Sequence, residues 1–514
     1  MLSNAGFRTH CIGALIASKQ MQLLYYDRSS IFVCKDFHIV DANGDATDLF
    51  IGAIISFSRL TEKQRGIQRS LCDDSAMIKT YTMRCRDDPK SLFQGVKLNL
   101  TVSEDGAQVV LTLGRIISRQ PGIIGRDTCV TEATASEYEP WKEKELVAKI
   151  SWPAASRVSE VEFVIKARKM AREMPQPLVD GVQSDWALDH LPDIIHSQDF
   201  DFDADSPQAA LREFFLKAKW ANNQIFLHED RVCRVTVQER LHRLEELKTP
   251  QEYAQVIVDI TQIHKWVYDH PCIIHRDISM GNIMWRRNLA GIICGVLNDF
   301  DLASYRSESG ATSRHRTGTR PYMAFELLKN DKEGRPPKHL YRHDLESILY
   351  AILHLSRCHE LDGSLPEGES QLVRVPYPTL DEWVHLPYDK LQASKQFFFF
   401  TSDPGDPEIE PTSSFEGFRP WLERLYNMFR TGFKAQSTFY DLSKAAAQKA
   451  LAPEPVDLFI PMTDEVAPFQ DPAPFNHHTL AGSVDYLKFL RVCRYFGGER
   501  LRLRNYQLVL EEET

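Results

Sequence analysis

An aspartate, followed five positions later by an asparagine, comes after an apolar run in the middle of the chain, where residues 273–282 read IIHRDISMGN. Phosphoryl transfer needs an aspartate within hydrogen-bond reach of the attacking hydroxyl group, and an oxygen that helps to hold a metal ion on the nucleotide phosphates. One loop with this spacing supplies both, with Asp277 as catalytic base, Asn282 as metal ligand and Arg276 beside the base. The alternative is a chance loop in which Arg276 and Asp277 form an ion pair.

A second carboxylate stands at the end of the next apolar run, where residues 296–303 read VLNDFDLA. Magnesium in phosphotransferases is commonly held by one or two protein oxygens together with the phosphates of the substrate. Asp299 and Asn282 would give that minimal set, so both are predicted ligands of Mg²⁺. An apolar strand that ends at an acidic residue is by itself as often a simple turn. The spacing of 17 residues between Asn282 and Asp299 favours the metal site.

A lysine on an earlier predicted strand matches the residue that holds the α- and β-phosphates of ATP in phosphotransferases with these motifs. It is Lys149, within the sequence VAKI. A glutamate on the following helix would fix this lysine. We expect Glu160, because it shares a helix face with apolar residues, whereas Glu162 shares a face with lysines. The alternative is an amphipathic helix on which both glutamates are exposed.

The loop that would cover the nucleotide contains fewer glycines than usual. Residues 125–130 read GRDTCV and offer one glycine where three are usual. Gly125 would admit the phosphates, and Val130 would cover the adenine base of the nucleotide. The place of this segment, two predicted strands before Lys149, favours this interpretation, so ATP is the expected cofactor.

Two later segments would position the catalytic loop. Residues 318–328 read GTRPYMAFELL, and a buried carboxylate at Glu326 would need an arginine partner, unless it is a solvated glutamate at a helix N-terminus. Residues 343–353 read HDLESILYAIL and predict a helix that is apolar nearly all round. Asp344 at its start would accept backbone N–H groups of the catalytic loop, with a plain helix cap as the alternative.

The elements that carry these residues follow from the spacing of apolar positions. Residues 1 to about 105 precede the motifs and are the candidate accessory segment. The proline- and aspartate-rich stretch near 175–207 has no sustained period and is predicted to be a surface insertion. Strands and helices alternate from about residue 231 to about 450. The expected strands cover 22–26, 30–33, 109–113, 128–131 and 145–150, and the expected helices cover 49–60 and 159–174.

Composition excludes several classes of protein. A chain of 514 residues with 43% hydrophobic residues can bury more than one core. The net charge of -10 is spread along the chain and no basic block occurs, which disfavours a nucleic-acid partner. No apolar run approaches the ~18 residues of a membrane span, so no membrane partner is expected. The ten cysteines form no C-x-x-C pair, which fits an intracellular protein, cytoplasmic or nuclear.

Several segments together resemble the fungal-type protein kinase family. They are 275–283, 299–303, 318–324 and 342–347, and the sequence YDRS at 26–29 resembles that family's segment ahead of the kinase lobes. The resemblance spans about residues 25–360. It implies a phosphotransferase that uses ATP and Mg²⁺ and transfers phosphate to a serine or threonine hydroxyl group of an unidentified protein substrate.

The implied fold class is α+β, with a small β-rich N-lobe, a larger and mainly helical C-lobe and an N-terminal accessory α/β segment. The expected domains are the accessory segment at 1–105, the N-lobe at 106–236 with an insertion near 175–207, the C-lobe at 237–450 and a C-terminal extension at 451–514.

Three residues depart from the general kinase pattern, two of them typical of this family, and a fourth residue departs from the family's own pattern. Ser279 stands where serine/threonine kinases have lysine, Asp301 replaces the glycine after Asp-Phe, and Phe325 replaces the proline before Glu326. Asp127 stands where the family tends to have glycine. It would put a carboxylate near the triphosphate, and repulsion between the two would lower the affinity for a nucleotide.

Two other functions remain open. A small-molecule phosphotransferase of the aminoglycoside or choline kinase type would share the aspartate and the asparagine but lack the segment that ends at Glu326. A pseudokinase that binds partners without catalysis would fit Ser279 and Asp127, whereas the presence of Lys149 and Asp277 argues against it.

Overall fold

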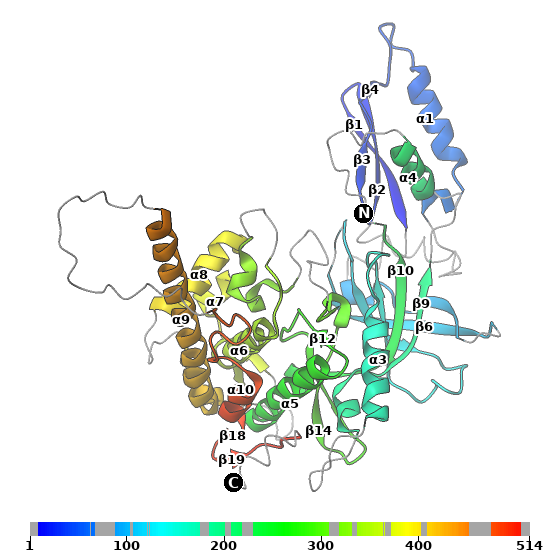
Figure 1. Ribbon diagram of the computed structural model, residues 1–514. Coiled ribbons are helices and arrows are strands. Elements are labelled where there is room, and N and C mark those ends of the chain that lie inside the picture. Colours follow the sequence, from blue (N-terminus) through cyan, green and yellow to red (C-terminus); the bar gives the residue numbers. More distant parts are fainter. Residues whose placement is uncertain are drawn as a thin grey trace, which may run out of the picture. The chain divides into compact units, whose positions relative to one another are not determined.

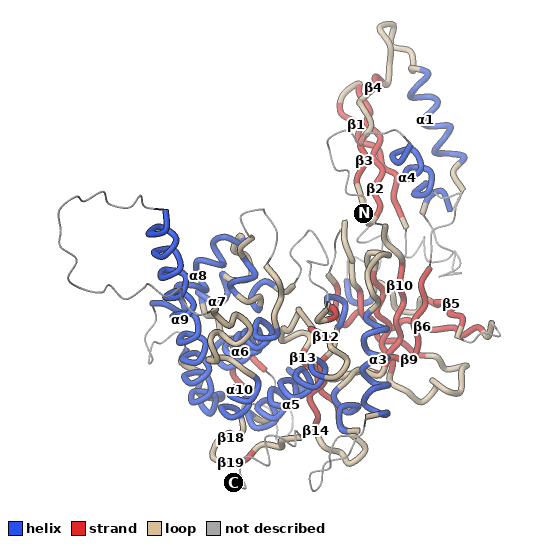
Figure 2. The backbone as a smooth tube through the Cα atoms, viewed as in Figure 1, coloured by secondary structure: helices blue, strands red, loops and turns tan. Residues whose placement is uncertain are grey.

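The computed structural model divides into two compact units. Unit 1 comprises Met1–Val161 and Asp193–Arg240, and unit 2 comprises Glu162–Pro192 and Leu241–Thr514. Figures 1 and 2 show the elements of both. The structure describes residues 9–61, 63–66, 88–102, 106–120, 122, 124–174, 185–200, 207–217, 230–307, 318–330, 337–362, 364, 372–401, 409–451 and 474–504.

A six-stranded antiparallel sheet forms the centre of unit 1, in the order β5-β6-β7-β8-β10-β9. Buried and less buried residues alternate along β5 and β6, because one face of each strand packs on the core. All residues of β8 are buried, which suits a central strand. The strands are β5 (Lys97–Thr101), β6 (Gln108–Arg119), β7 (Cys129–Thr134), β8 (Leu146–Ser151), β9 (Ile194–Phe200) and β10 (Cys233–Glu239).

Two strands of this sheet come from segments that were not expected to contribute to it. β5 comes before residue 106, and β9 lies within the stretch predicted as a surface insertion. β9 pairs with β10 along most of its length and so serves as the edge strand of the sheet. The polar composition of β9 agrees with an edge position, where one side of the strand is not covered by another.

An N-terminal module, which we define as β1–β4, α1 and α4, completes unit 1. β1 and β2 form a regular hairpin, with His10 opposite Asp27 and Ala17 opposite Gln20. Helix α4 comes from the predicted insertion, yet Gln208 Nε2 lies 3.0 Å from His10 Nδ1 in the buried interior of the module. The elements are β1 (His10–Ala17), β2 (Gln20–Asp27), β3 (Ile31–Val33), β4 (Phe37–His38), α1 (Asp48–Arg59) and α4 (Pro207–Lys217).

Unit 2 is mainly helical, with α5 and α6 at its centre. Helix α5 begins after Thr249, whose side chain and that of Glu252 form a capping box around a proline at the first turn. Both helices are buried on nearly every face. The helices are α5 (Pro250–Asp269), α6 (Tyr341–Cys358), α7 (Pro378–Glu382), α8 (Tyr388–Thr401), α9 (Arg419–Leu451) and α10 (Tyr486–Cys493), and α3 (Glu160–Glu173) begins at the end of unit 1.

Short antiparallel pairs complete unit 2 and carry its loops. β11 (His242–Arg243), β13 (Ile283–Arg287) and β14 (Ile293–Leu297) form one sheet. The two-stranded pairs are β12 (Ile273–Ile274) with β15 (Ser304–Tyr305), β16 (His359–Leu361) with β17 (Leu372–Arg374), and β18 (Tyr495–Phe496) with β19 (Glu499–Arg500).

The combination of an antiparallel sheet and a helical body is compatible with the expected kinase-like fold. Among the described residues, no helix is long and apolar enough to cross a membrane.

Candidate active site

The loop between β12 and β13 holds Asp277 through its neighbours. The Asp277 carboxylate accepts hydrogen bonds from the backbone N–H (2.8 Å) and the hydroxyl group (2.9 Å) of Thr319. The Asn282 amide nitrogen donates to the Asp277 carbonyl oxygen at 2.8 Å. Since that nitrogen is used, the amide oxygen is the atom that Asn282 offers to a metal ion. The expected base and ligand therefore lie on one well-fixed loop.

Asp344 anchors the residue before the base. Its carboxylate accepts the Arg276 backbone N–H at 3.2 Å, which is the contact predicted for it. His264 Nε2 and His339 Nε2 each lie 2.7 Å from the same carboxylate. Burial alone would raise the pKa of Asp344, but the two histidines hold it well below its usual value. The anchor lets Arg276 keep a left-handed backbone, with φ of 71°.

His275 links this loop to the next strand. Its Nε2 lies 3.0 Å from the Asn298 carbonyl oxygen, and the Asp277 backbone N–H donates to Nδ1 at 3.4 Å. Both contacts fit a neutral ring that carries its proton on Nε2. Burial lowers the pKa of His275 to about 4, so the ring stays neutral at pH 7. The ring also packs edge-on against Phe300.

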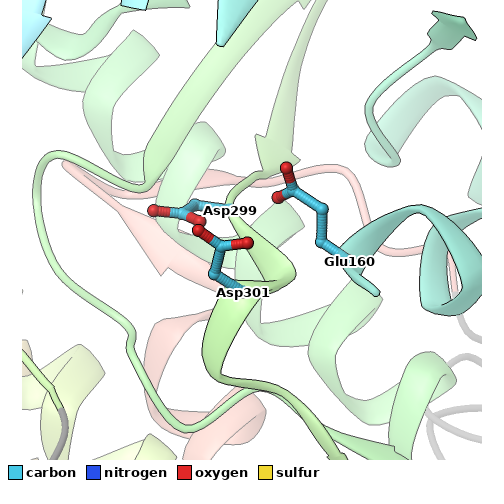
Figure 3. Close-up of side chains that lie close together, drawn as sticks. All are labelled: Glu160, Asp299 and Asp301. Atoms are coloured by element: carbon cyan, nitrogen blue, oxygen red, sulfur yellow. The ribbon is translucent and has the colours of Figure 1, made fainter. Parts of the chain in front are cut away.

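Asp299 and Asp301 place two carboxylates beside each other in unit 2 (Figure 3). Ligand oxygens of the two side chains lie within 4.8 Å of one another. Asp299 has a left-handed backbone with φ of 63°, directly before the 3₁₀ helix Phe300–Leu302. Asp301 lies within that helix and so does not need the conformational freedom of glycine.

The donor set of unit 2 fits magnesium. Asn282, Asp299 and Asp301 offer only hard oxygen atoms, which Mg²⁺ prefers. The sequence predicted the first two as ligands, and the structure adds Asp301 as a neighbour of Asp299.

In unit 1, Lys149 on β8 pairs with the first residue of α3. Lys149 Nζ lies 2.8 Å from Glu160 Oε2, and the two side chains are only 9% and 7% exposed. The sequence predicted this pairing with Glu160 rather than with Glu162. This ion pair fixes the orientation of Lys149, the residue that the sequence predicts to hold phosphate. Glu160 is the third side chain labelled in Figure 3.

The loop between β6 and β7 contains the remaining predicted residues. Gly125 has φ of 110°, and a side chain added there would meet nothing within 4 Å. The position therefore requires glycine for its backbone conformation, and it leaves open space beside the loop. Val130 lies on β7, directly opposite Lys149 on β8.

Asp127 on the same loop differs from the expectation. Its carboxylate is 7% exposed and lies 2.5 Å from Arg28 Nη2, so it is paired with a cation rather than directed as a bare charge toward a triphosphate. Sequence reasoning missed Arg28. The signal for it was the YDRS segment at 26–29, which entered only as part of a resemblance.

Glu326, whose side chain is 20% exposed, has the arginine partner that was expected for it. Arg342 Nη1 donates to it, His343 Nε2 lies 3.3 Å from the same oxygen, and Gln436 Nε2 donates to the other oxygen at 3.0 Å. Against the effect of burial, hydrogen bonds from His343 and Arg342 hold the pKa of Glu326 well below its usual range. Glu326 is thus a structural carboxylate of unit 2.

Phe325, which replaces a proline, uses the N–H group that proline lacks. This N–H donates to Glu346 Oε1 at 2.8 Å, and the Phe325 ring packs against Phe399 and Phe433. Burial raises the pKa of Glu346 to about 7 despite this donor.

A buried lysine on α8, which sequence reasoning also missed, holds the same segment from the other side. Lys395 Nζ donates to the carbonyl oxygens of Pro321 (2.7 Å) and Met323 (2.6 Å), and it lies over the rings of Tyr350 and Trp383. Both backbone N–H groups and backbone carbonyl oxygens of the segment from Thr319 to Phe325 are therefore held by hydrogen bonds to other parts of unit 2.

Comparison with known proteins agrees with the resemblance seen in the sequence. No curated protein matches the chain. The sequence model of one family, described as fungal protein kinase, matches residues 2–356, which includes the N-terminal module as well as both sets of site residues. The chain therefore belongs to the fungal protein kinase family.

Proposed function

We propose that this chain is an ATP-dependent protein kinase that transfers the γ-phosphate of Mg-ATP to a serine or threonine hydroxyl group of a protein substrate. The observation that carries the proposal is the double hydrogen bond from Thr319 to the Asp277 carboxylate. It ties the candidate base to the segment that ends at Glu326, on which a peptide would lie. A small-molecule phosphotransferase has no need of such a segment, so a protein substrate is favoured.

Each unit has its own part in the proposed reaction. In unit 1, Lys149 would hold the α- and β-phosphates, and Glu160 would fix the lysine. Gly125 would admit the phosphates, and Val130 would cover the adenine base. In unit 2, Asn282 and Asp299 would hold Mg²⁺, which when bound neutralises charge on the phosphates. Arg276 would keep the base in place through its bond to Asp344.

The chemical step is an in-line displacement at the γ-phosphorus. The substrate hydroxyl oxygen forms a bond to phosphorus, the bond from phosphorus to the bridging oxygen of ADP breaks, and the hydroxyl proton passes to Asp277. Ser279 offers no positive charge where other protein kinases have lysine. Since loss of one transition-state donor costs on the order of 10²–10³ in rate, we expect slow but measurable turnover.

The eight cysteines among the described residues are all free thiols. Free thiols suit a reducing compartment, so we place the proposed activity inside the cell.

The test is phosphate transfer from radiolabelled ATP to peptide and metabolite pools, with Asp277→Asn beside the wild type. We expect the variant to lose transfer while its affinity for Mg-ATP is unchanged, because the base acts on the acceptor and binds no metal. Asp441→Asn, at an exposed site on α9, is the matched control and should keep full activity.

Equal transfer by the wild type and Asp277→Asn, or none by either, would favour the pseudokinase. Transfer to metabolites alone would favour the small-molecule enzyme.

A further inference from the structure

The turn between β2 and β3 in the N-terminal module has a fixed shape. Asp27 Oδ1 accepts hydrogen bonds from the backbone N–H groups of Ser29 and Ser30, both at 2.8 Å. The Tyr25 hydroxyl group donates to Asp27 Oδ2 at 2.9 Å. Asp27 is itself buried, so its bonds are shielded from water. The turn therefore presents Arg28 in one orientation.

Arg28 contacts the loop between β6 and β7 at three points. Its Nη1 donates to the Gly122 carbonyl oxygen at 2.7 Å, and its Nη2 lies 2.5 Å from Asp127 Oδ2. Its carbonyl oxygen accepts the Gly125 N–H at 3.0 Å. The Arg28 side chain is 2% exposed and stands over the Trp152 ring. A buried arginine with this many partners fixes what it binds, because its planar group allows few other geometries.

The loop needs such a partner. Asp127 has φ of 39°, a left-handed conformation that favours glycine and strains other residues. Its carboxylate also accepts the Gly122 N–H at 3.2 Å, which closes the loop on itself. An aspartate here would otherwise carry a negative charge on the loop that is to receive phosphates. Pairing with Arg28 removes that charge and offsets the strain.

We propose that Arg28 is a positioning residue for nucleotide binding, through which the N-terminal module holds the phosphate-binding loop in shape and neutralises Asp127. The inference rests on the proposed function, since it takes the loop to bind the triphosphate. It makes the N-terminal module a working part of the kinase rather than an accessory, and it assigns a role to the YDRS segment.

The test uses the full chain and four variants: Arg28→Met, Asp127→Gly, the two combined, and Arg115→Met. Arg115 lies on β6 and forms an exposed ion pair with Asp88, so it is the matched control. The dissociation constant of Mg-ATP is measured by titration with a fluorescent ATP analogue. Hydrogen exchange of residues 120–128 reports the shape of the loop without any nucleotide.

Arg28→Met should weaken Mg-ATP binding about tenfold or more and speed exchange across the loop, because Asp127 is left as an unpaired charge. The added Asp127→Gly change should restore most of the affinity, since it removes both the charge and the strained side chain. Arg115→Met should change neither readout. Phosphate transfer at saturating ATP should fall less than the affinity does.

Folded Arg28→Met protein with wild-type affinity would overturn the role of Arg28. A double variant that binds as weakly as Arg28→Met alone would overturn the charge argument and leave a purely structural contact. Absence of nucleotide binding by the wild type is a different outcome, because it would overturn the proposed function itself. In that case, faster loop exchange in Arg28→Met would still support the role of Arg28 in shaping the loop, and only the proposed function would have failed.

Discussion

Asp299 combines a charge with a backbone conformation that aspartate rarely adopts. Residues other than glycine are kept in the left-handed region only where the surroundings enforce it, and such residues concentrate at functional sites. The neighbouring Asp301 adds a second negative charge within 4.8 Å. Two adjacent carboxylates repel each other, and a metal ion held between them, as we propose, would relieve that repulsion.

Asp299→Asn should therefore abolish Mg²⁺-dependent nucleotide binding. The substitution keeps the size of the side chain and removes its charge. Of the two predicted ligands, Asp299 is the charged one, and Asn282 is neutral. The measurement is the thermal shift given by ATP with and without Mg²⁺. Asp441→Asn is the control. An unchanged magnesium-dependent shift in Asp299→Asn would contradict the metal assignment.

At the scale of elements, the segment from Thr319 to Glu326 is held from three directions. Thr319 donates to Asp277, Lys395 on α8 binds two carbonyl oxygens of the segment, and Glu346 on α6 accepts the Phe325 N–H. None of these contacts is local in sequence. The segment thus has a single shape although its last turn is a short 3₁₀ helix, which rarely holds itself together.

Phe325→Pro tests one of these contacts. Ala324 already has φ of -57° and ψ of 140°, which suits a residue before proline, and Phe325 is the first residue of its helix, where proline is tolerated. The backbone therefore admits proline, and the main loss besides the ring is the N–H donor to buried Glu346. We expect Phe325→Pro to destabilise more than Phe325→Ala by about 1–3 kcal/mol.

The measurement is urea unfolding of both variants. Alanine is the control because it removes the ring and keeps the N–H group. If Phe325→Ala is the less stable of the two, losing the N–H donor costs less than the rigidity of proline contributes, and the argument is wrong.

Contacts that follow from a local pattern could be predicted from the sequence. Helical spacing chose Glu160 over Glu162 as the partner of Lys149, and burial required an arginine for Glu326. The strands and helices expected before residue 175 are also present, with shifts at their ends. These features depend on residues within one or two adjacent elements.

Contacts between distant segments could not be predicted. Arg28 and Asp127 are 99 positions apart, and neither lies in a periodic element that would reveal the other. Helix α4 joins β1 through Gln208 and His10, although the segments between them gave no pairing signal. Lys395 reads as a surface lysine on a helix of weak periodicity, and only the folded structure shows that it is buried.

At the scale of the whole molecule, unit 2 buries several histidines as neutral rings. Burial lowers the pKa of His190 and His354 to about 3, and of His275 and His343 to about 4, all from the ordinary 6.5. The unfolded chain binds a proton at each of these groups below pH 6.5, whereas the folded chain does not. Their contribution to stability is therefore present above pH 6.5 and is lost as the pH falls.

Two buried carboxyl groups act in the opposite direction. Burial raises the pKa of Glu346 to about 7 and of Asp259 to about 6, so the folded chain holds protons there that the unfolded chain releases above pH 4.5. These four histidines and two carboxyl groups alone contribute a net uptake of about two protons on unfolding near pH 5.5. Their share of the free energy of unfolding should accordingly fall by roughly 2–3 kcal/mol per pH unit there.

Urea unfolding at pH 7.5, 6.5 and 5.5 measures this slope. His354→Leu is the matched variant, because its ring lies among Tyr322 and Trp383 and is replaced by an apolar side chain in an aromatic surrounding. The variant should take up about one proton fewer on unfolding, and its stability should depend less on pH than that of the wild type. A slope near zero or of opposite sign in the wild type would show that the histidines are protonated in the folded chain. The neutral His275 ring, with its two contacts to the catalytic loop, would then have to be reassigned as well, because a protonated Nδ1 cannot accept the Asp277 N–H.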